Sequence, residues 1–434
     1  MESVKDKAIA AKEAFIKLSN AKTKDKNDVL IQMGKSLDKN RKKILDANKL
    51  DILEAKKLLK SGGITESLVK RLEVTDSKID DMISGIRDVV KLEDPVGKTL
   101  SAIELDRRLE LYQIATPIGV IGMVFEARPD VAPQIISLAL KSGNGVLLKG
   151  GRESAKTNKV IFEVLTNSIK NKSIPKEAFQ LLERREDVTE MLKLDKYIDL
   201  IIPRGSNEFV RFVQSNTKIP VLGHADGICH AYVDKKYDEK NALDVCFDAK
   251  VQYPAVCNAI ETLLVHEKSA KKFLPKMGKM YKEAGVEMRC CEQSYEILKD
   301  LKVKKAKEKD WSTEYNDLII SIKVVKSLED AVSHINRYGS HHTDTIITED
   351  KKASEYFLNY VDSSSVMLNA STRFADGFRY GKGAEIGIST GKIHARGPTG
   401  MEGMLIYKYK LIGNGHKVSD YVGKNAKSFT HRKL

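Results

Sequence analysis

Apolar residues recur every three or four positions through residues 1–91, which is the period of amphipathic helices. The clearest stripes are Ala8, Ala11, Phe15, Leu18 and then Val29, Leu30, Met33, Leu37. Gly62-Gly63 interrupts the pattern and predicts a break between helices. Between Thr99 and Ala115 the pattern changes to short alternating segments, which predict a β-hairpin.

Short apolar runs alternate with helical stretches from residue 119 onward. In the first such region we expect strands at 119–125, 146–148 and 198–202, with helices at 131–141, 154–169 and 208–214. A second region, 238–366, contains expected strands at 260–265, 318–325 and 345–348 with helices between them. This alternation predicts an α/β fold with parallel sheets covered on both faces.

Composition indicates an ordinary globular chain of more than one domain. The 434 residues are 41% hydrophobic and 31% charged, and their length exceeds that of a single core. The N-terminus has no apolar segment of a secretory signal, and no apolar run reaches the length of a membrane span.

The net charge of +14 raises the question of nucleic-acid binding. The lysines alternate with acidic residues along helical stretches such as 21–58, which is typical of solvated helix faces. Aromatic residues do not alternate with basic ones as in a stacking platform. We therefore expect no nucleic-acid partner, and we expect the charge to attract an anionic substrate and cofactor.

Cys257 is the most informative of the five cysteines. The five are odd in number and lack C-x-x-C spacing, so they predict neither a disulfide framework nor a metal site and fit a reducing, cytoplasmic compartment. Cys257 follows Pro254-Ala255-Val256 and precedes Asn258 and a strand-like run, which predicts a turn. A thiol on such a turn can approach a helix N-terminus and ionise there as a nucleophile, whereas a buried structural thiol is the alternative.

Three predicted strands end in turns suited to a ligand. Glu126-Ala127-Arg128-Pro129 follows the first strand, Lys149-Gly150-Gly151-Arg152 the second, and Arg204-Gly205-Ser206 the third. Ligands of open α/β sheets bind at the carboxyl ends of the strands, and glycines allow close approach of the backbone. A G-x-G-x-x-G fingerprint and a Walker A loop are both absent, and the pair His341-His342 reads as an exposed surface turn.

Several segments together resemble the aldehyde dehydrogenase superfamily and, within it, the gamma-glutamyl phosphate reductase family. The resemblance covers about residues 5–415, and its most specific segments are Pro117–Gly122, Phe125–Pro129, Lys149–Glu153, Ile202–Gly205, Cys257–Val265, Val361–Ser364, Asn369–Phe374 and His394–Pro398.

This resemblance implies a Rossmann-type cofactor domain, an α/β catalytic domain and a small β-flap used in oligomerisation. We expect the cofactor domain at 1–98 and 115–233 with a return at 367–394, the catalytic domain at 234–366, and the flap and tail at 99–114 and 395–434. It also implies a set of site residues: Cys257 as nucleophile, Asn258 and backbone N–H groups as oxyanion donors, and Lys149, Gly150, Gly151, Arg152, Gly205, Ser206 and Glu314 around the cofactor.

Chemistry adds two substrate candidates and a cofactor preference. Arg128 and Arg373 can bind a carboxylate or phosphate in bidentate fashion, or each can serve a structural ion pair. Arg152 stands where several NAD-using members carry a glutamate, and a cation suits the 2′-phosphate of NADPH.

Two departures from the wider superfamily favour reduction over hydrolysis. The oxyanion asparagine of hydrolytic members is missing near Glu126–Arg128, and in place of their general-base glutamate the chain reads Val221–Gly227, with His224 nearby. A thioester that exchanges with phosphate needs no base to activate water.

The expected function is therefore NADPH-dependent reduction of L-glutamyl 5-phosphate to L-glutamate 5-semialdehyde, the second step of proline biosynthesis from glutamate. The alternative is another hydrolytic or acylating member with a different substrate. Expected partners are further copies of the chain, as a dimer or tetramer, and a transient glutamate 5-kinase, with no metal.

Overall fold

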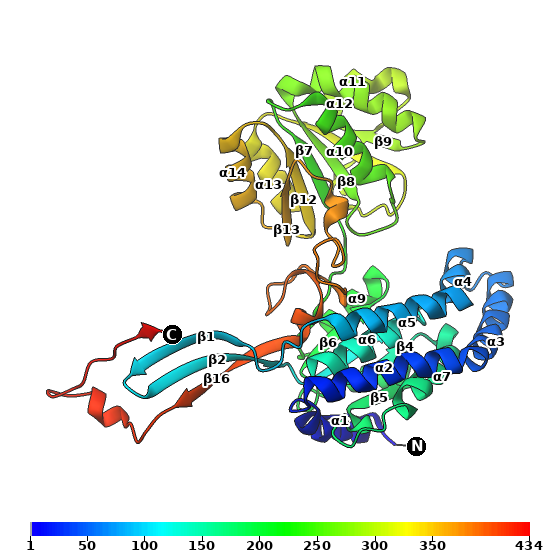
Figure 1. Cartoon of the computed structure of the whole chain (residues 1–434). Coiled ribbons are helices and arrows are strands. Elements are labelled where there is room, and N and C mark those ends of the chain that lie inside the picture. Colours follow the sequence, from blue (N-terminus) through cyan, green and yellow to red (C-terminus); the bar gives the residue numbers. More distant parts are fainter. Residues whose placement is uncertain (1) are drawn as a thin grey trace. The chain divides into compact units, whose positions relative to one another are not determined.

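The computed structural model of the chain describes residues 2–434 and has two compact units. The first unit ends at Leu222 and also contains Gly400–Leu434, and the second is Gly223–Thr399. Figure 1 shows the elements of both units. No helix in the described range 2–434 is long and apolar enough to cross a membrane.

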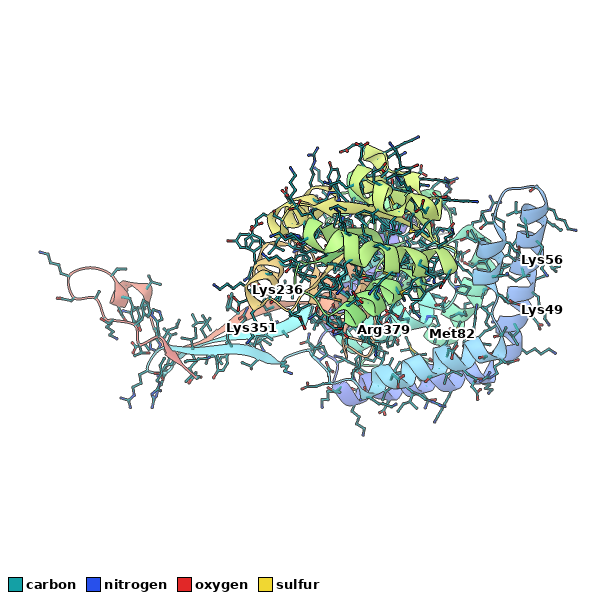
Figure 2. All side chains as sticks on the ribbon, turned by 90° about the horizontal axis from the view of Figure 1, so that it is seen from above. Lys49, Lys56, Met82, Lys236, Lys351 and Arg379 are labelled. Carbon is teal, nitrogen blue, oxygen red and sulfur yellow. The ribbon has the colours of Figure 1, made fainter. Side chains whose placement is uncertain are left out.

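Five helices open the first unit, as the apolar period predicts. They are α1 (Val4–Leu18), α2 (Thr23–Lys39), α3 (Arg41–Lys60), α4 (Glu66–Leu72) and α5 (Asp76–Lys91). Ser3 and Asp6 form a capping box that starts α1, and the apolar stripe of α2 is buried at Val29, Leu30, Met33 and Leu37. The lysines of α3 point outward, as at Lys49 and Lys56 (Figure 2), which confirms a solvated face for this helix. Lys26 of α2, in the same predicted stretch, is instead buried in an ion pair with Asp94.

A four-stranded parallel sheet follows in the first unit. Its order is β5-β4-β3-β6, with β3 (Val120–Phe125), β4 (Gly145–Gly150), β5 (Phe179–Leu182) and β6 (Leu200–Arg204). The intervening helices are α6 (Val131–Ser142), α7 (Ala155–Asn167), α8 (Glu186–Met191) and α9 (Asn207–Ser215). Ala8 and Ala11 of α1 pack with Val120 and Leu147 in one buried cluster. The predicted strands and helices of this region are confirmed, and β5 was not predicted.

The predicted hairpin is β1 (Thr99–Asp106) with β2 (Leu109–Pro117), and it belongs to an antiparallel sheet of order β16-β2-β1-β17. The other two strands, β16 (Leu405–Ile412) and β17 (Arg432–Lys433), come from the C-terminal segment. This sheet extends away from the helices of its unit (Figure 1).

A seven-stranded parallel sheet forms the second unit, in the order β10-β9-β11-β8-β7-β12-β13. Its strands are β7 (Cys229–Val233), β8 (Ile260–His266), β9 (Glu287–Cys290), β10 (Lys304–Lys305), β11 (Ile319–Val325), β12 (Thr343–Ile347) and β13 (Ser365–Leu368). Helices α10 (Glu239–Val251), α11 (Glu267–Glu283), α12 (Glu292–Leu298), α13 (Leu328–Tyr338) and α14 (Lys351–Tyr360) connect them. The second α/β region is thereby confirmed.

A two-stranded antiparallel ribbon, β14 (Gly387–Ser389) with β15 (Gly397–Thr399), completes the second unit. Residues 367–394, which we expected to return to the cofactor domain, lie in this unit. The functional division into cofactor, catalytic and oligomerisation parts stays a prediction.

Candidate active site

The three predicted ligand turns of the first unit lie side by side. Because β4, β3 and β6 are parallel neighbours, their carboxyl ends meet at one sheet edge. Phe125 at the end of β3 pairs with Gly150 of β4 on one side and with Arg204 of β6 on the other. The turns that follow these three residues therefore form one continuous rim, where open α/β sheets bind ligands.

Lys149 presents a buried ammonium group at this rim. Its side chain is only 6% exposed, and its Nζ donates to the carbonyl of Gly150. Burial lowers the pKa of Lys149, and the nearby Glu153 carboxylate partly offsets that effect. Arg152, at the start of the short helix after β4, is exposed. The end of β4 and the turn after it thus carry one buried and one exposed cation.

Backbone at the rim is packed too closely for any side chain. A Cβ at Gly150 would lie 2.1 Å from the Nδ2 of Asn158, and one at Gly205 would lie 2.6 Å from the Oε2 of Glu126. A side chain at either position would have to displace the Asn158 amide or the Glu126 carboxylate.

Two carboxylates, unnoticed in the sequence, accept backbone N–H groups at the same rim. The Oε2 of Glu126 accepts from the N–H of Ser206 at 2.8 Å, at the start of α9, and the Oε1 of Glu153 accepts from the N–H of Ala127 at 2.7 Å. Backbone N–H groups at a helix N-terminus are the groups that bind phosphate in dinucleotide sites. Together with the cations of the rim, these N–H groups suit the phosphates of a nicotinamide dinucleotide.

Cys257 lies in the second unit, on a half-buried turn between α10 and β8. The turn is closed by a hydrogen bond of 3.0 Å from the N–H of Ala259 to the carbonyl of Val256. The next element is strand β8 and not a helix. It therefore does not place a helix N-terminus beside the thiol, as we had expected. Gly227 packs against it so closely that a Cβ there would lie 2.5 Å from the Cα of Cys257.

Asn258 fastens this turn to a distant segment. Its Nδ2 donates to the carbonyl of Ala375 at 2.9 Å, and its own carbonyl accepts from the Oγ1 of Thr372 at 2.6 Å. One of the two amide N–H bonds of Asn258 is therefore engaged, and its predicted part in oxyanion binding would use the other. The segment so held includes the short helix Thr372–Phe374 and with it Arg373.

Arg373 is a buried cation whose charge acts on Cys257. It is 8% exposed, and its Nε donates to the Oε1 of Gln252 at 3.0 Å. Burial lowers the pKa of its guanidinium, Arg379 adds repulsion, and Cys257 opposes the shift. No carboxylate within 2–434 comes within ion-pair distance of it, so the described residues give Arg373 no structural ion pair.

The remaining two candidates are less constrained. Arg128 is exposed in the first unit, between β3 and α6. Glu314 is half-buried in the second unit, and its charge contributes to raising the pKa of Glu261. The same segment is fixed by the N–H of Asn316, which donates to the Oε1 of Glu261 at 3.2 Å.

His342 is the residue that the sequence reading placed wrongly. We expected His341-His342 to be an exposed turn, but His342 is fully buried next to β12, while His341 is only partly so. It lies with His224 and Cys257, and one nitrogen or sulfur atom of each falls within 4.8 Å of the others. In the sequence, the polar residues before β12 look like an exposed loop. The structure differs because β12 is buried on both faces and His342 is buried with it.

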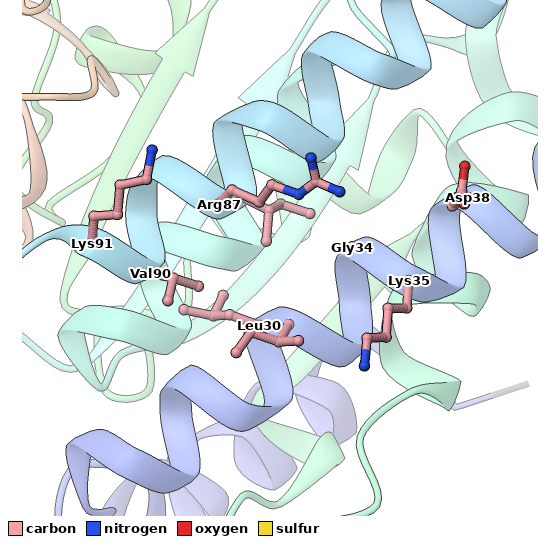
Figure 3. Close-up of a pocket in the computed structure, with 9 residues that line it drawn as sticks. Leu30, Gly34, Lys35, Asp38, Arg87, Val90 and Lys91 are labelled. Carbon is pink, nitrogen blue, oxygen red and sulfur yellow. The ribbon is translucent and has the colours of Figure 1, made fainter.

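A pocket of about 360 Å³ lies elsewhere in the first unit, between α2 and α5 (Figure 3). Its lining combines apolar residues with four charged ones: Leu30, Ile31, Gly34, Ile86 and Val90 with Lys35, Asp38, Arg87 and Lys91. None of the predicted site residues contributes to it.

Comparison with known proteins shows a consistent relationship. The aldehyde dehydrogenase family matches residues 1–294. A gamma-glutamyl phosphate reductase of Methanosarcina acetivorans is 60% identical over 100% of this chain and 98% of its own length. One from Acetivibrio thermocellus is 52% identical, also over 100% of this chain and 98% of its own length.

Comparison with solved structures indicates the same relationship. A crystal structure of gamma-glutamyl phosphate reductase from Thermotoga maritima superposes with a TM-score of 0.92 at 42% identity, covering 96% of this chain and 100% of that one. A glyceraldehyde-3-phosphate dehydrogenase from Methanocaldococcus jannaschii has a TM-score of 0.64 at 14% identity, covering 95% and 96%, and shares the fold. The chain belongs to the aldehyde dehydrogenase family and, within it, to the gamma-glutamyl phosphate reductases.

Proposed function

We propose that this chain uses NADPH to reduce L-glutamyl 5-phosphate to L-glutamate 5-semialdehyde and phosphate, with Cys257 as the nucleophile. The observation that carries the proposal is the half-buried Cys257 turn beside Arg373, a buried guanidinium without a carboxylate partner in the described part of the chain. A thiol next to an anion site is what attack on an acyl phosphate requires.

The residues of the second unit perform the covalent steps. The Cys257 thiolate attacks the acyl carbon, and the bond to the phosphate oxygen breaks with its electron pair leaving on phosphate. A thioester on Cys257 remains. When bound, a reduced nicotinamide would supply the hydride that reduces this carbon. The resulting oxyanion re-forms the carbonyl, the carbon–sulfur bond breaks, and the Cys257 thiolate is restored.

Negative charge on the carbonyl oxygen has to be stabilised in both parts of the reaction, formation of the thioester and its reduction. Backbone N–H groups of the Cys257 turn and the remaining N–H of Asn258 are the donors we propose, each contributing about 2.7–4 kcal/mol. Arg373, and Arg128 in the first unit, are proposed to bind the substrate's carboxylate and phosphate.

We assign the cofactor to the rim of the first unit. Lys149, Gly150 and Gly151, with Gly205 and Ser206, would hold the dinucleotide, and Glu314 its nicotinamide ribose. Glu126 and Glu153 already accept two backbone N–H groups there, so these donors suit anionic oxygens.

Hydrolytic oxidation of an aldehyde is the second candidate, and His224 supports it. Its ring lies in one cluster with Cys257, so an imidazole is available that could activate water against a thioester. This function would need no phosphate.

The decisive assay runs the reaction backwards. We would supply L-glutamate 5-semialdehyde and NADP⁺ and follow NADPH formation with and without inorganic phosphate, using Cys257→Ala as the control. We expect turnover only when phosphate and Cys257 are both present. Turnover without phosphate would establish the hydrolytic function, and no turnover in either case would mean a different substrate.

Cofactor preference is tested at Arg152. An exposed cation after β4 can pair with the 2′-phosphate that distinguishes NADPH from NADH. Arg152→Glu should therefore raise the KM for NADPH by about 10-fold or more, as loss of a charged hydrogen bond predicts, and change that for NADH little. Steady-state kinetics with both cofactors measures this, and equal effects would contradict the assignment.

Assembly and location complete the proposal. We propose a dimer or tetramer built through the antiparallel sheet of β1, β2 and β16, and transient contact with a separate glutamate 5-kinase because acyl phosphates are short-lived. A cytoplasmic location stays a prediction from the cysteine usage.

A further inference from the structure

His224, Cys257 and His342 come from three separate segments that the sheet brings to one edge. They precede β7, β8 and β12 respectively, which are parallel neighbours in the order β8-β7-β12. Residues before adjacent parallel strands lie at the same edge, which explains how side chains so far apart in sequence converge. One donor atom of each falls within 4.8 Å of the others, and the two imidazole centroids are 4.9 Å apart.

The hydrogen bonds of the two rings indicate which nitrogen of each carries the proton. The Nδ1 of His224 is 2.8 Å from the carbonyl oxygen of Ile388. A carbonyl can only accept, so Nδ1 carries the proton and the Nε2 of a neutral ring keeps its lone pair. Donation of the second ring nitrogen to a backbone carbonyl is the usual arrangement of a metal-binding histidine.

In His342 the Nδ1 faces two side chains in place of a carbonyl. Its Nδ1 is 2.8 Å from the Oγ1 of Thr343 and 3.6 Å from the Sγ of Cys229. Cys229 gives its own proton to the carbonyl of Cys257, so its sulfur is left as an acceptor, which favours a proton on the Nδ1 of His342. The Nε2 of His342 is buried and has no hydrogen-bond partner among residues 2–434. A buried lone pair without a donor is costly unless something binds it.

We propose that Cys257, His224 and His342 form a binding site for Zn²⁺ and similar thiophilic divalent cations, and that the bound cation blocks the nucleophile. Two imidazole nitrogens and one thiolate are standard zinc ligands, with bonds of about 2.0–2.3 Å. Those bonds place tetrahedral ligands about 3.5 Å apart, so side-chain shifts of about 1 Å close the site. The fourth position stays open to water.

Binding converts the thiol into a ligand. The S–H bond breaks, its proton passes to solvent, and a sulfur–metal bond forms with the electron pair that would otherwise attack an acyl carbon. A chelator reverses the exchange, so the site is a reversible block. Metal binding does not depend on the proposed function. Only the expected loss of turnover rests on that function.

Co²⁺ is the probe, because a thiolate ligand gives it a near-ultraviolet charge-transfer band that zinc lacks. We would titrate Co²⁺ into the full-length protein without substrates, expect one equivalent to bind with this band, and expect Zn²⁺ to displace it. Cys257→Ser should abolish the band. His224→Asn and His342→Asn retain a donor near the Nδ1 position but lack Nε2, and each should weaken binding at least 10-fold. Matched controls are His341→Ala and Cys291→Ser, which should bind as the wild type does.

The outcomes separate this inference from the proposed function. A missing band, a band that persists in Cys257→Ser, or asparagine variants that bind normally would each overturn the metal site. A band with the expected variant pattern supports it, whether or not the protein turns over glutamate semialdehyde. Phosphate-dependent turnover without a band would leave the proposed function standing and would reduce the two histidines to neighbours of the thiol.

Discussion

Gly227 determines how closely two backbone segments approach around the nucleophile. A Cβ at this position would lie 2.3 Å from the carbonyl oxygen of Cys257 and 2.6 Å from its Cβ. Both obstacles belong to the Cys257 residue itself, so relief requires the turn to move. Here the glycine is required by contact and not by its backbone conformation.

Gly227→Ala should therefore impair catalysis more than folding. Displacing a reacting atom by about 1 Å can cost about 100-fold in rate, and overpacking costs about 1–3 kcal/mol of stability. We expect kcat/KM to fall by about that factor in the phosphate-dependent assay. The control is Gly85→Ala, on α5 with nothing within 4 Å of the added Cβ, which should keep full activity. Full activity in Gly227→Ala would contradict the positioning role.

Individual site residues differed in how far the sequence could locate them. Cys257 stands in the turn that its neighbours predict, whereas Lys149, expected in the turn after its strand, is the penultimate residue of β4. Asn258 was expected to face a reacting oxygen, whereas the structure shows one of its N–H groups on Ala375, 117 residues away. Contacts over that distance leave no periodic trace in sequence.

Between α10 and β8 the second unit contains a buried ion pair that the proposed mechanism does not use. The Nζ of Lys250 is 2.6 Å from the Oε2 of Glu261, and both side chains are at most 1% exposed. Burial raises the pKa of Glu261 to about 7 and lowers the pKa of Lys250, while each partner opposes the shift of the other. The pair joins the helix before the Cys257 turn to the strand after it.

Removing one member of this ion pair should lower the free energy of unfolding far more than removing both. Lys250→Met leaves a buried carboxylate without a cation, which costs about 3–5 kcal/mol, whereas apolar replacement of a whole pair is often neutral. We expect the free energy of unfolding, measured in urea, to fall by that amount in Lys250→Met. It should recover largely in the double variant Lys250→Met, Glu261→Leu. Additive losses in the double variant would show that the two groups stabilise the protein separately.

Elements with a full apolar pattern were predictable from the sequence, whereas several short strands and the exposed strand β16 were not. The long helices of residues 2–91 and the seven-residue strand β8 carry a full apolar pattern and were predicted. β5, β9 and β13 have four residues each, too few for alternation to be recognised, and they were not. The order of the strands within each sheet could not be predicted from the sequence, because it depends on packing between segments far apart along the chain.

At the scale of the whole molecule, the antiparallel sheet of the first unit has an open side. β16 pairs with β2 along its full length, and no strand in 2–434 pairs with its other edge. Tyr409, Leu411 and Ile412 of this edge strand are exposed. An apolar, unpaired edge promotes aggregation unless a partner covers it, which supports the proposed assembly of several copies.

Charge on this edge should disrupt that assembly. Leu411→Lys places a cation on the strand, and we expect sedimentation velocity to show a smaller species than the wild type. Leu53→Lys on α3 is the matched control, because both leucines are 58% exposed and only one lies on the sheet. Unchanged assembly in Leu411→Lys would exclude this edge as the contact.

The hydrogen bonds between Asn258 and the segment 372–375 have a consequence for the nascent chain. Thr372 and Ala375 lie 114 and 117 residues downstream of Asn258, so the ribosome has released the thiol long before its anchors exist. At 5–20 residues per second that interval is roughly 6 to 23 s. During it the nascent cysteine lacks its neighbouring guanidinium and its fixed turn. The proposed active site is therefore assembled late in translation, and a prematurely terminated chain would carry the Cys257 thiol without the segment that holds its turn.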